Sequence, residues 1–312
     1  MKQIRRHQQT QPADYWDMMF VEHREYFAAP LEHREQGTNL PEKHRLGAWN
    51  LPWMKSCAWD CACYGSIVAP ESADVTFGLK AAADFLTAGF HMTRTGELEY
   101  TIAGHHVLLR LLEKDDAPVR EYSSFAWSDW TDCFHLNALC RNTKNLERIC
   151  HKACLDYATH YSDGSRGVRC SKDCWPHANA LLALHNDESG RVIGQYLVDA
   201  LQIIVKKEEQ IGQREYANYI FGHEIALLMA AINRAPNFED QLADALEQYK
   251  KFYTSFDDEP DPDPQFRPWN RPHGFLAINL LGIAAMAWDW GMRFEIDSEY
   301  LPMRFVTGEF LK

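Results

Sequence analysis

The residues of this chain whose types and spacing most resemble a metal site are cysteines and histidines. Three pairs of cysteines are four residues apart, and four histidines lie near such pairs in the sequence: Cys57/Cys61, Cys150/Cys154, Cys170/Cys174, His135, His151, His160 and His177. Cys150 and Cys154, however, fall on an apolar helical face, where a thiol packs as a small hydrophobic group. We therefore expect buried free thiols and no metal, and keep a helical enzyme with a metal held by Cys and His as the alternative.

Other catalytic patterns are incomplete. His223-Glu224 begins like the zinc helix His-Glu-x-x-His, but Leu227 occupies the place of the second histidine. His105 and His106 are neighbours in an expected strand, so their side chains should point to opposite faces. The chain also contains no Gly-x-Ser-x-Gly elbow, no phosphate-binding loop and no dinucleotide fingerprint. We therefore predict no catalytic residues, no cofactor and no enzymatic activity.

The elements around these residues have mostly helical periodicity. Residues 70–74 resemble a helix start, and Phe77, Ala81, Phe85 and Ala88 follow at helical spacing. Further helices are expected over 192–205, 216–232 and 238–253, and an apolar helix followed by an extended tail near the C-terminus. A single helix is also expected to bury one stripe of side chains: Leu146, Ile149, Cys150, Ala153, Cys154 and Tyr157.

One segment departs from this pattern. Near residues 97–111, Leu98, Tyr100 and Ile102 alternate with polar residues before Gly104, which predicts a β-hairpin. The predicted fold class is therefore mainly α, an antiparallel helical array or bundle with one small hairpin. We divide the chain into an N-terminal arm and docking helix at 1–50 and a single helical domain at 51–312. The arm has a loose lead-in, and its helix could share a face of Tyr15, Met18, Met19 and Phe27.

The composition and net charge of the chain limit the classes of function that its sequence supports. The chain has 312 residues, 46% of them hydrophobic, and a net charge of −12. Nucleic acid is an unfavourable partner, because its binding depends on Lys and Arg that neutralise phosphates. No apolar run is long enough to span a membrane, and the N-terminus lacks the pattern of an export signal. An odd number of cysteines in a protein of this size favours reduced thiols and a cytoplasmic location.

An acidic segment is the clearest candidate for partner binding. Residues 236–265 hold nine Asp or Glu and two Lys, and five prolines between 256 and 272 exclude regular helix there. The segment is either a solvated helix face and linker or a landing site for an electropositive partner. If the segment is a landing site, its acidic side chains would speed association with the partner and its aromatic side chains would anchor the partner. The expected contact residues are Asp257, Asp258, Glu259, Asp261, Asp263, Phe266 and Trp269.

Three stretches of this chain resemble the immunity protein 49 family of bacterial polymorphic-toxin systems. The C-terminal one comprises Pro272-His273-Gly274-Phe275-Leu276-Ala277-Ile278, residues 281–291, and Glu295 with Ser298-Glu299-Tyr300-Leu301-Pro302. The second runs from Trp130 to Asn137-Ala138-Leu139-Cys140-Arg141, and the third is the Ala-rich segment 81–90. Where such families usually have Asp-Arg-Gly, this chain has Asp289-Trp290-Gly291, so no role for that arginine carries over. The first fifty residues lie outside the resemblance.

The resemblance implies a function that residue chemistry alone does not give. It implies a mainly α-helical, cytoplasmic protein that protects a bacterium by binding a cognate toxin, a protein encoded by a neighbouring gene. The expected mechanism is stoichiometric occlusion of the toxin in interbacterial competition, without turnover and without nucleic acid or membrane as partners.

Overall fold

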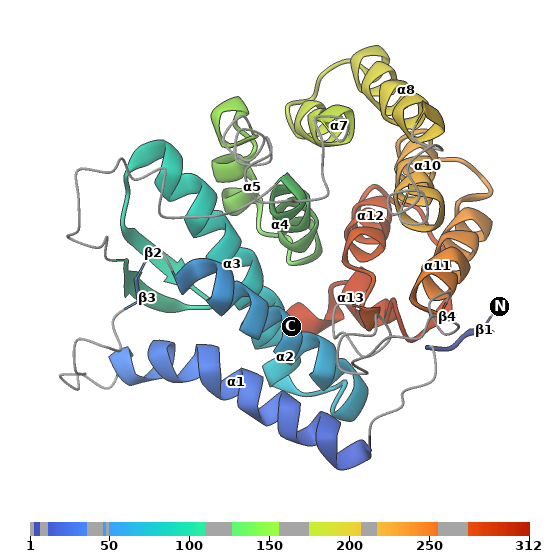
Figure 1. Ribbon diagram of the computed structural model, residues 1–312. Helices are drawn as coiled ribbons and strands as arrows, with labels where there is room; N and C mark the ends of the chain where they lie inside the picture. The colour runs from blue at the N-terminus through green and yellow to red at the C-terminus, as the bar shows by residue number, and fades with distance from the viewer. Residues whose placement is uncertain are drawn as a thin grey trace. The chain divides into compact units, whose positions relative to one another are not determined.

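The computed structural model describes residues 3–6, 12–35, 46–47, 50–109, 127–155, 175–206, 217–254 and 274–312. These residues are mainly helical with a small antiparallel hairpin, which confirms the predicted fold class (Figure 1). They form two compact units, one of residues 12–166 and one of residues 1–11 with 167–312. Compact units need not fold separately, so the expected division into an arm at 1–50 and a single domain at 51–312 stays a prediction.

Helices α1 (Ala13–Glu35), α2 (Leu51–Val68) and α3 (Ala73–Thr95) form the body of the first unit. Ser72 caps α3 as expected, because its side chain accepts a hydrogen bond from the backbone N–H of Asp74. At the contact between α2 and α3, a Cβ on Gly78 would lie 2.7 Å from the carbonyl oxygen of Ala58. A side chain at position 78 would push the backbones of α2 and α3 apart, so glycine at this position permits their close packing.

Helix α1 packs on α2, but not through the face expected from the sequence. Trp16, Phe27 and Leu31 are buried at 2%, 0% and 0% exposure. Met18 is 54% exposed and points away from that side, so the prediction that Tyr15, Met18, Met19 and Phe27 share a face is wrong. The residues that α1 leaves on the surface are considered below.

The hairpin consists of β2 (Glu99–Ile102) and β3 (His105–Leu108), within the predicted range. Helices α4 (Trp127–Leu139) and α5 (Thr143–Ile149) follow. The continuous helix predicted through Cys154 is wrong, because α5 ends at Ile149 and the backbone of Cys150 leaves helical geometry. Cys150 and Cys154 are nevertheless buried as expected, at 8% and 0% exposure. Ala153, predicted on the same buried stripe, is exposed, and Tyr157 lies outside the described residues.

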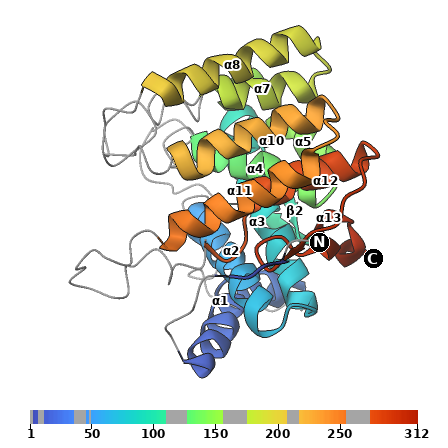
Figure 2. The same ribbon diagram turned by 90° about the vertical axis from the view of Figure 1, so that its right-hand side faces the viewer.

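The second unit stacks helices in layers, which Figure 2 shows along their length. These are α7 (Trp175–His185), α8 (Gly190–Lys206), a π-helical turn η6 (Ala217–Phe221), α10 (Gly222–Ile232), α11 (Phe238–Thr254) and α12 (Ile278–Asp289). The predicted helices over 192–205 and 238–253 are present, and the one predicted over 216–232 is present from Ala217 as η6 followed by α10. Alternating apolar and polar faces explain this agreement, because each helix buries one side against its neighbours.

The N-terminal strand was not expected. β1 (Gln3–Ile4) pairs in parallel with β4 (Asp297–Ser298), and Ile4 is buried at 1% exposure. Arg6 donates hydrogen bonds to the carbonyl oxygens of Phe275, at 3.1 Å, and Glu299, at 2.7 Å. The predicted loose lead-in is therefore wrong for residues 3–6, which the C-terminal tail holds in place.

The tail ends in α13 (Met303–Val306) and a 3-10 turn, η10 (Glu309–Leu311). Among the helices that the structure describes, none is both long and apolar enough to cross a membrane.

Candidate functional site

The acidic residues predicted to bind a partner, Asp257, Asp258, Glu259, Asp261, Asp263, Phe266 and Trp269, lie outside the described residues. Their role stays a prediction. The structure instead brings together a polar cleft that residue spacing did not predict.

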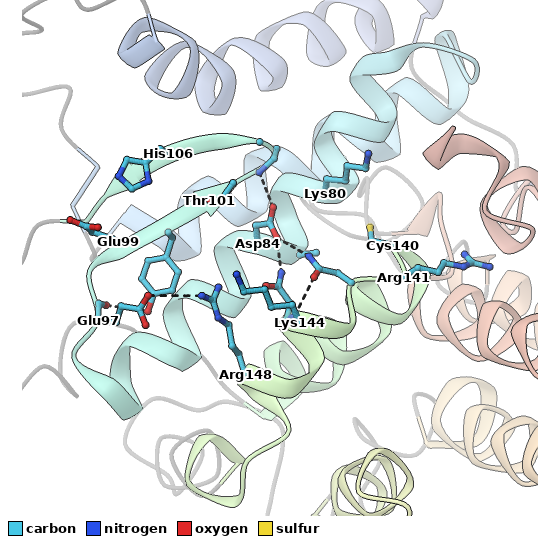
Figure 3. Close-up of a pocket in the computed structure, with 16 residues that line it drawn as sticks. Lys80, Asp84, Glu97, Glu99, Thr101, His106, Cys140, Arg141, Lys144 and Arg148 are labelled. Carbon is cyan, nitrogen blue, oxygen red and sulfur yellow. Dashed lines mark hydrogen bonds and ion pairs between the residues drawn. The ribbon is translucent and has the colours of Figure 1, made fainter.

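The cleft lies in the first unit and is formed by α3, the β2–β3 hairpin and α5 (Figure 3). It has a volume of about 660 Å³. Its charged lining comes from all of these elements and from the end of α4: Lys80, Asp84, Glu97, Glu99, Arg141, Lys144 and Arg148. Four cations therefore gather beside three carboxyl groups in a protein whose net charge is −12.

Asp84 is the centre of the hydrogen-bond network in this cleft (Figure 3). One carboxyl oxygen accepts a 2.7 Å bond from the backbone N–H of Ala103, at the turn of the hairpin. The other accepts bonds from the side-chain amides of Asn145, at 2.6 Å, and Asn142, at 3.4 Å. Asn142 also caps α5 by accepting from the backbone N–H of Asn145. One side chain of α3 thus fixes both the hairpin turn and the first turn of α5.

The hairpin turn needs such support. Ala103 and Gly104 have φ values of 48° and 95°, as a two-residue type I′ turn requires. Glycine adopts this conformation readily, but alanine does so at a cost of about 1–2 kcal/mol. The bond from the Ala103 N–H to Asp84 offsets part of this cost.

The outer edge of the cleft holds an ion pair on an aromatic ring. The guanidinium of Arg148 lies 5.8 Å from the ring centroid of Tyr100 and 3.9 Å from a carboxylate oxygen of Glu97. The hydroxyl of Tyr100 donates to the carbonyl oxygen of Glu97 at 3.1 Å. These contacts join the start of the hairpin to α5, so the edge of the cleft is built from both.

The chemistry of this cleft favours binding of charged groups. Burial raises the pKa of Cys140 to about 12, so its thiol is protonated near neutral pH and is not a thiolate nucleophile. Burial also raises the pKa of Asp84 to about 6, although bonds from Ala103 and Asn145 and the charges of Arg148 and Lys80 act in the opposite direction. The cleft can offer both cations and carboxylates to a polar partner group.

The pKa of Asp84 leads to a testable pH dependence. Its folded pKa lies above its ordinary value of 3.8, so folding favours the protonated form, and the stability this contributes is lost as pH rises through about 6. Relative to Asp84→Asn, the wild type should gain about 1 kcal/mol of unfolding free energy between pH 7.5 and pH 5. Urea unfolding of both proteins across this range measures the difference.

A second variant sharpens this test. Asn145→Ala removes a hydrogen bond to the ionised carboxyl, so it should raise the pKa further and move the gain to higher pH. A difference between wild type and Asp84→Asn that does not change with pH would contradict the burial of this carboxyl.

The cysteine and histidine candidates do not form a metal centre in the described part of the chain. No group of three His, Cys, Asp or Glu side chains there is placed to hold a metal ion. Six cysteines are buried free thiols: Cys57, Cys61, Cys63, Cys133, Cys150 and Cys154. Burial raises the pKa of Cys57, Cys61, Cys133, Cys150 and Cys154. Cys170 and Cys174 lie outside the described residues.

His223 and Glu224 have structural contacts. Glu224 is 3% exposed and accepts a 2.9 Å hydrogen bond from Asn279, which links α10 to α12. His223 lies 3.4 Å from a carboxylate oxygen of Asp244 on α11. The resemblance of this pair to a zinc helix therefore reflects packing between helices.

The three stretches that carry the family resemblance form packing contacts. Asn137 of α4 donates to the hydroxyl of Thr87 on α3 at 3.0 Å and to the carbonyl of Cys133 at 2.8 Å. At the C-terminus, the N–H of Ala277 donates to the carbonyl of Tyr300 at 3.0 Å, and Tyr300 is fully buried. The sequence hints at the cleft through Asp84, the one acid in the Ala-rich segment 81–90.

Comparison with known proteins gives one match. The model of a family described as Immunity protein 49 matches residues 68–305, about three quarters of the chain. No curated protein and no solved structure matches the chain. The matched segment includes all the residues that line the cleft.

Proposed function

The chain belongs to the immunity protein 49 family, and we propose that it binds and neutralises a cognate bacterial toxin encoded by a neighbouring gene. The family match is the observation that carries this proposal, because immunity families protect the cell through a toxin partner. We place the protein in the cytoplasm, where it meets the toxin and blocks it stoichiometrically, without catalysis. Charged groups of the cleft around Asp84 are compatible with such binding.

The acidic segment is the first part of the chain that we propose contacts the toxin. Residues 257–263 carry five carboxylates, with Phe266 and Trp269 following in the sequence. Toxin domains that act on nucleic acid commonly have basic surfaces, because phosphates must be neutralised. We propose that this segment attracts the toxin and that its aromatic residues anchor it.

Co-expression tests the proposed function. The polypeptide encoded beside this gene should kill or arrest a host cell alone, and expression of this protein should restore growth. The two should also elute together as a 1:1 complex on a sizing column. Toxicity without rescue and without a complex would reject the proposal for that pair.

Charge reversal tests the acidic segment separately. Asp258→Lys with Asp261→Lys should weaken toxin binding about 10-fold at low salt and make the remaining affinity less sensitive to salt, since attractive charges have been removed. Glu188→Lys with Glu309→Lys changes the net charge equally at exposed positions outside residues 236–265 and is the matched control. Calorimetric titrations at two salt concentrations measure both effects. Equal weakening by the two pairs would show a general charge effect and reject the segment as a contact.

A further inference from the structure

Helix α1 and the start of α2 expose a group of large apolar side chains. Met18, Val21 and Tyr26 of α1 are 54%, 54% and 41% exposed, and Trp53 of α2 is 51% exposed. The Tyr26 and Trp53 rings contact each other, with centroids 5.5 Å apart. Met18 and Val21 are neighbours one turn apart on the helix. Exposed single apolar residues are ordinary, but neighbouring ones can mark a contact surface.

Carboxylates lie around Met18 and Val21 on α1. Asp14, Asp17 and Glu25 are exposed on α1, and their helical spacing places them on the same side as Met18 and Val21. Glu22 accepts a hydrogen bond from the Tyr26 hydroxyl. We call the eight residues Asp14, Asp17, Met18, Val21, Glu22, Glu25, Tyr26 and Trp53 the α1 patch. Met18 and Val21 form its apolar centre, the four carboxylates form an acidic rim around them, and the Tyr26/Trp53 pair lies beyond Glu22.

Arg24 of α1 and Lys55 of α2, cations whose side chains the structure describes on these helices, are held in ion pairs with other residues. Arg24 pairs with Asp74 at 3.0 Å and Glu32 at 2.8 Å. Lys55, two residues after Trp53, is 8% exposed and pairs with Asp129 at 3.0 Å. The charge that the α1 patch presents to a partner is therefore dominated by its four carboxylates.

We propose that the α1 patch is a docking surface for the toxin, and that the matching surface of the toxin carries Lys and Arg around an apolar centre. This inference rests on the proposed function and adds a place and a chemistry to it. Family membership does not account for the patch, because all eight residues precede the matched segment at 68–305. A second copy of this chain fits poorly, because it would bring two acidic rims together.

Paired substitutions test the apolar centre. Met18→Ser with Val21→Ser should weaken toxin binding 10- to 100-fold, because the partner then loses its apolar contact. Val192→Ser with Val198→Ser is the matched control, since these α8 residues are 36% and 40% exposed and lie in the other unit. The control should bind within twofold of wild type, and both variants should unfold at the wild-type temperature.

The possible outcomes distinguish failure of the patch proposal from failure of the proposed function. If wild type and the Met18/Val21 variant bind the toxin equally well, the proposal for the α1 patch is overturned and the proposed function still stands. Failure of wild type to bind or to rescue would reject the proposed function, and the patch proposal with it. The elution volume of the free protein on a sizing column tests whether a second copy of the chain occupies the patch. If wild type self-associates and the Met18/Val21 variant does not, the assignment of the patch to the toxin would also be overturned.

A charge variant tests the chemistry of the partner. Asp17→Lys with Glu25→Lys should slow association with the toxin about 10-fold at low salt, and this difference should shrink at high salt. Unchanged or faster association would overturn the assignment of a basic partner surface. Stopped-flow mixing at two salt concentrations measures these rates.

Discussion

Replacing Trp130 with alanine is expected to lower the free energy of unfolding by about 4 kcal/mol. The Trp130 side chain is fully buried, and its ring packs beside that of Phe134, with centroids 5.9 Å apart. Its indole N–H donates a 3.2 Å hydrogen bond to the carbonyl of Ile149, which joins α4 to the end of α5. Alanine would leave a cavity and remove this link, and the urea midpoint of the helical circular-dichroism signal measures the loss.

Trp130→Phe separates the hydrogen bond from the packing. Phenylalanine fills most of the space but cannot donate, and the Ile149 carbonyl still accepts from the N–H of His151 at 2.7 Å. The expected cost is therefore about 1–2 kcal/mol, well below that of alanine. Equal costs for the two variants would show that the hydrogen bond, not the packing, dominates at this position.

The second large effect is expected at Lys55. This side chain of α2 is 8% exposed, and its amino group lies 3.0 Å from Asp129 and 3.8 Å from Asp132, both on α4. Burial by itself lowers the pKa of Lys55, but the two carboxylates outweigh it and the pKa is raised. Lys55→Met should cost about 3 kcal/mol, because it leaves two partly buried carboxylates without their cation.

A combined variant tests that explanation. Lys55→Met with Asp129→Asn and Asp132→Asn removes all the charges together, and it should recover a large part of the stability lost by Lys55→Met alone. The deficit of Lys55→Met should also shrink as pH falls. Burial raises the pKa of Asp132 to about 6 even with Lys55 present, and loss of Lys55 raises it further. No recovery in the combined variant would contradict the electrostatic origin of the effect.

Both positions lie where the first unit is held together. Trp130 connects α4 to α5, which lines the cleft, and Lys55 connects α4 to α2, which packs against α1. We therefore expect the two destabilising variants to lose toxin binding only where they unfold. The surface substitutions should reduce binding in a protein that stays folded.

Local sequence patterns predicted the elements whose helical or alternating periodicity is strong. Helix α8 and helix α11 each bury one face, and Ser72 gives α3 a recognisable start. The alternation of Leu98, Tyr100 and Ile102 likewise predicted the hairpin. Each of these signals is contained in a short segment, so no knowledge of the neighbouring elements was needed.

Features that depend on neighbouring elements could not be predicted. Helix α5 stops at Ile149 although apolar spacing continues to Cys154, and the short sequence there contains no Gly or Pro to mark the end. In α1, apolar residues occur on more than one side of the helix, so the sequence did not show that Trp16 packs on Tyr64 of α2, that Phe27 packs on Phe77 of α3, or that Met18 is exposed. The cleft forms because Asp84 meets segments 19 and 61 residues away in sequence.

Titration of the purified toxin with this protein tests the central claim most directly. We predict that toxin activity falls in proportion to the protein added and is lost at one equivalent, with a complex of 1:1 mass. Loss of activity at a small fraction of an equivalent would indicate catalytic inactivation and contradict stoichiometric binding. Full toxin activity in the presence of excess folded protein would contradict neutralisation of that toxin by this chain.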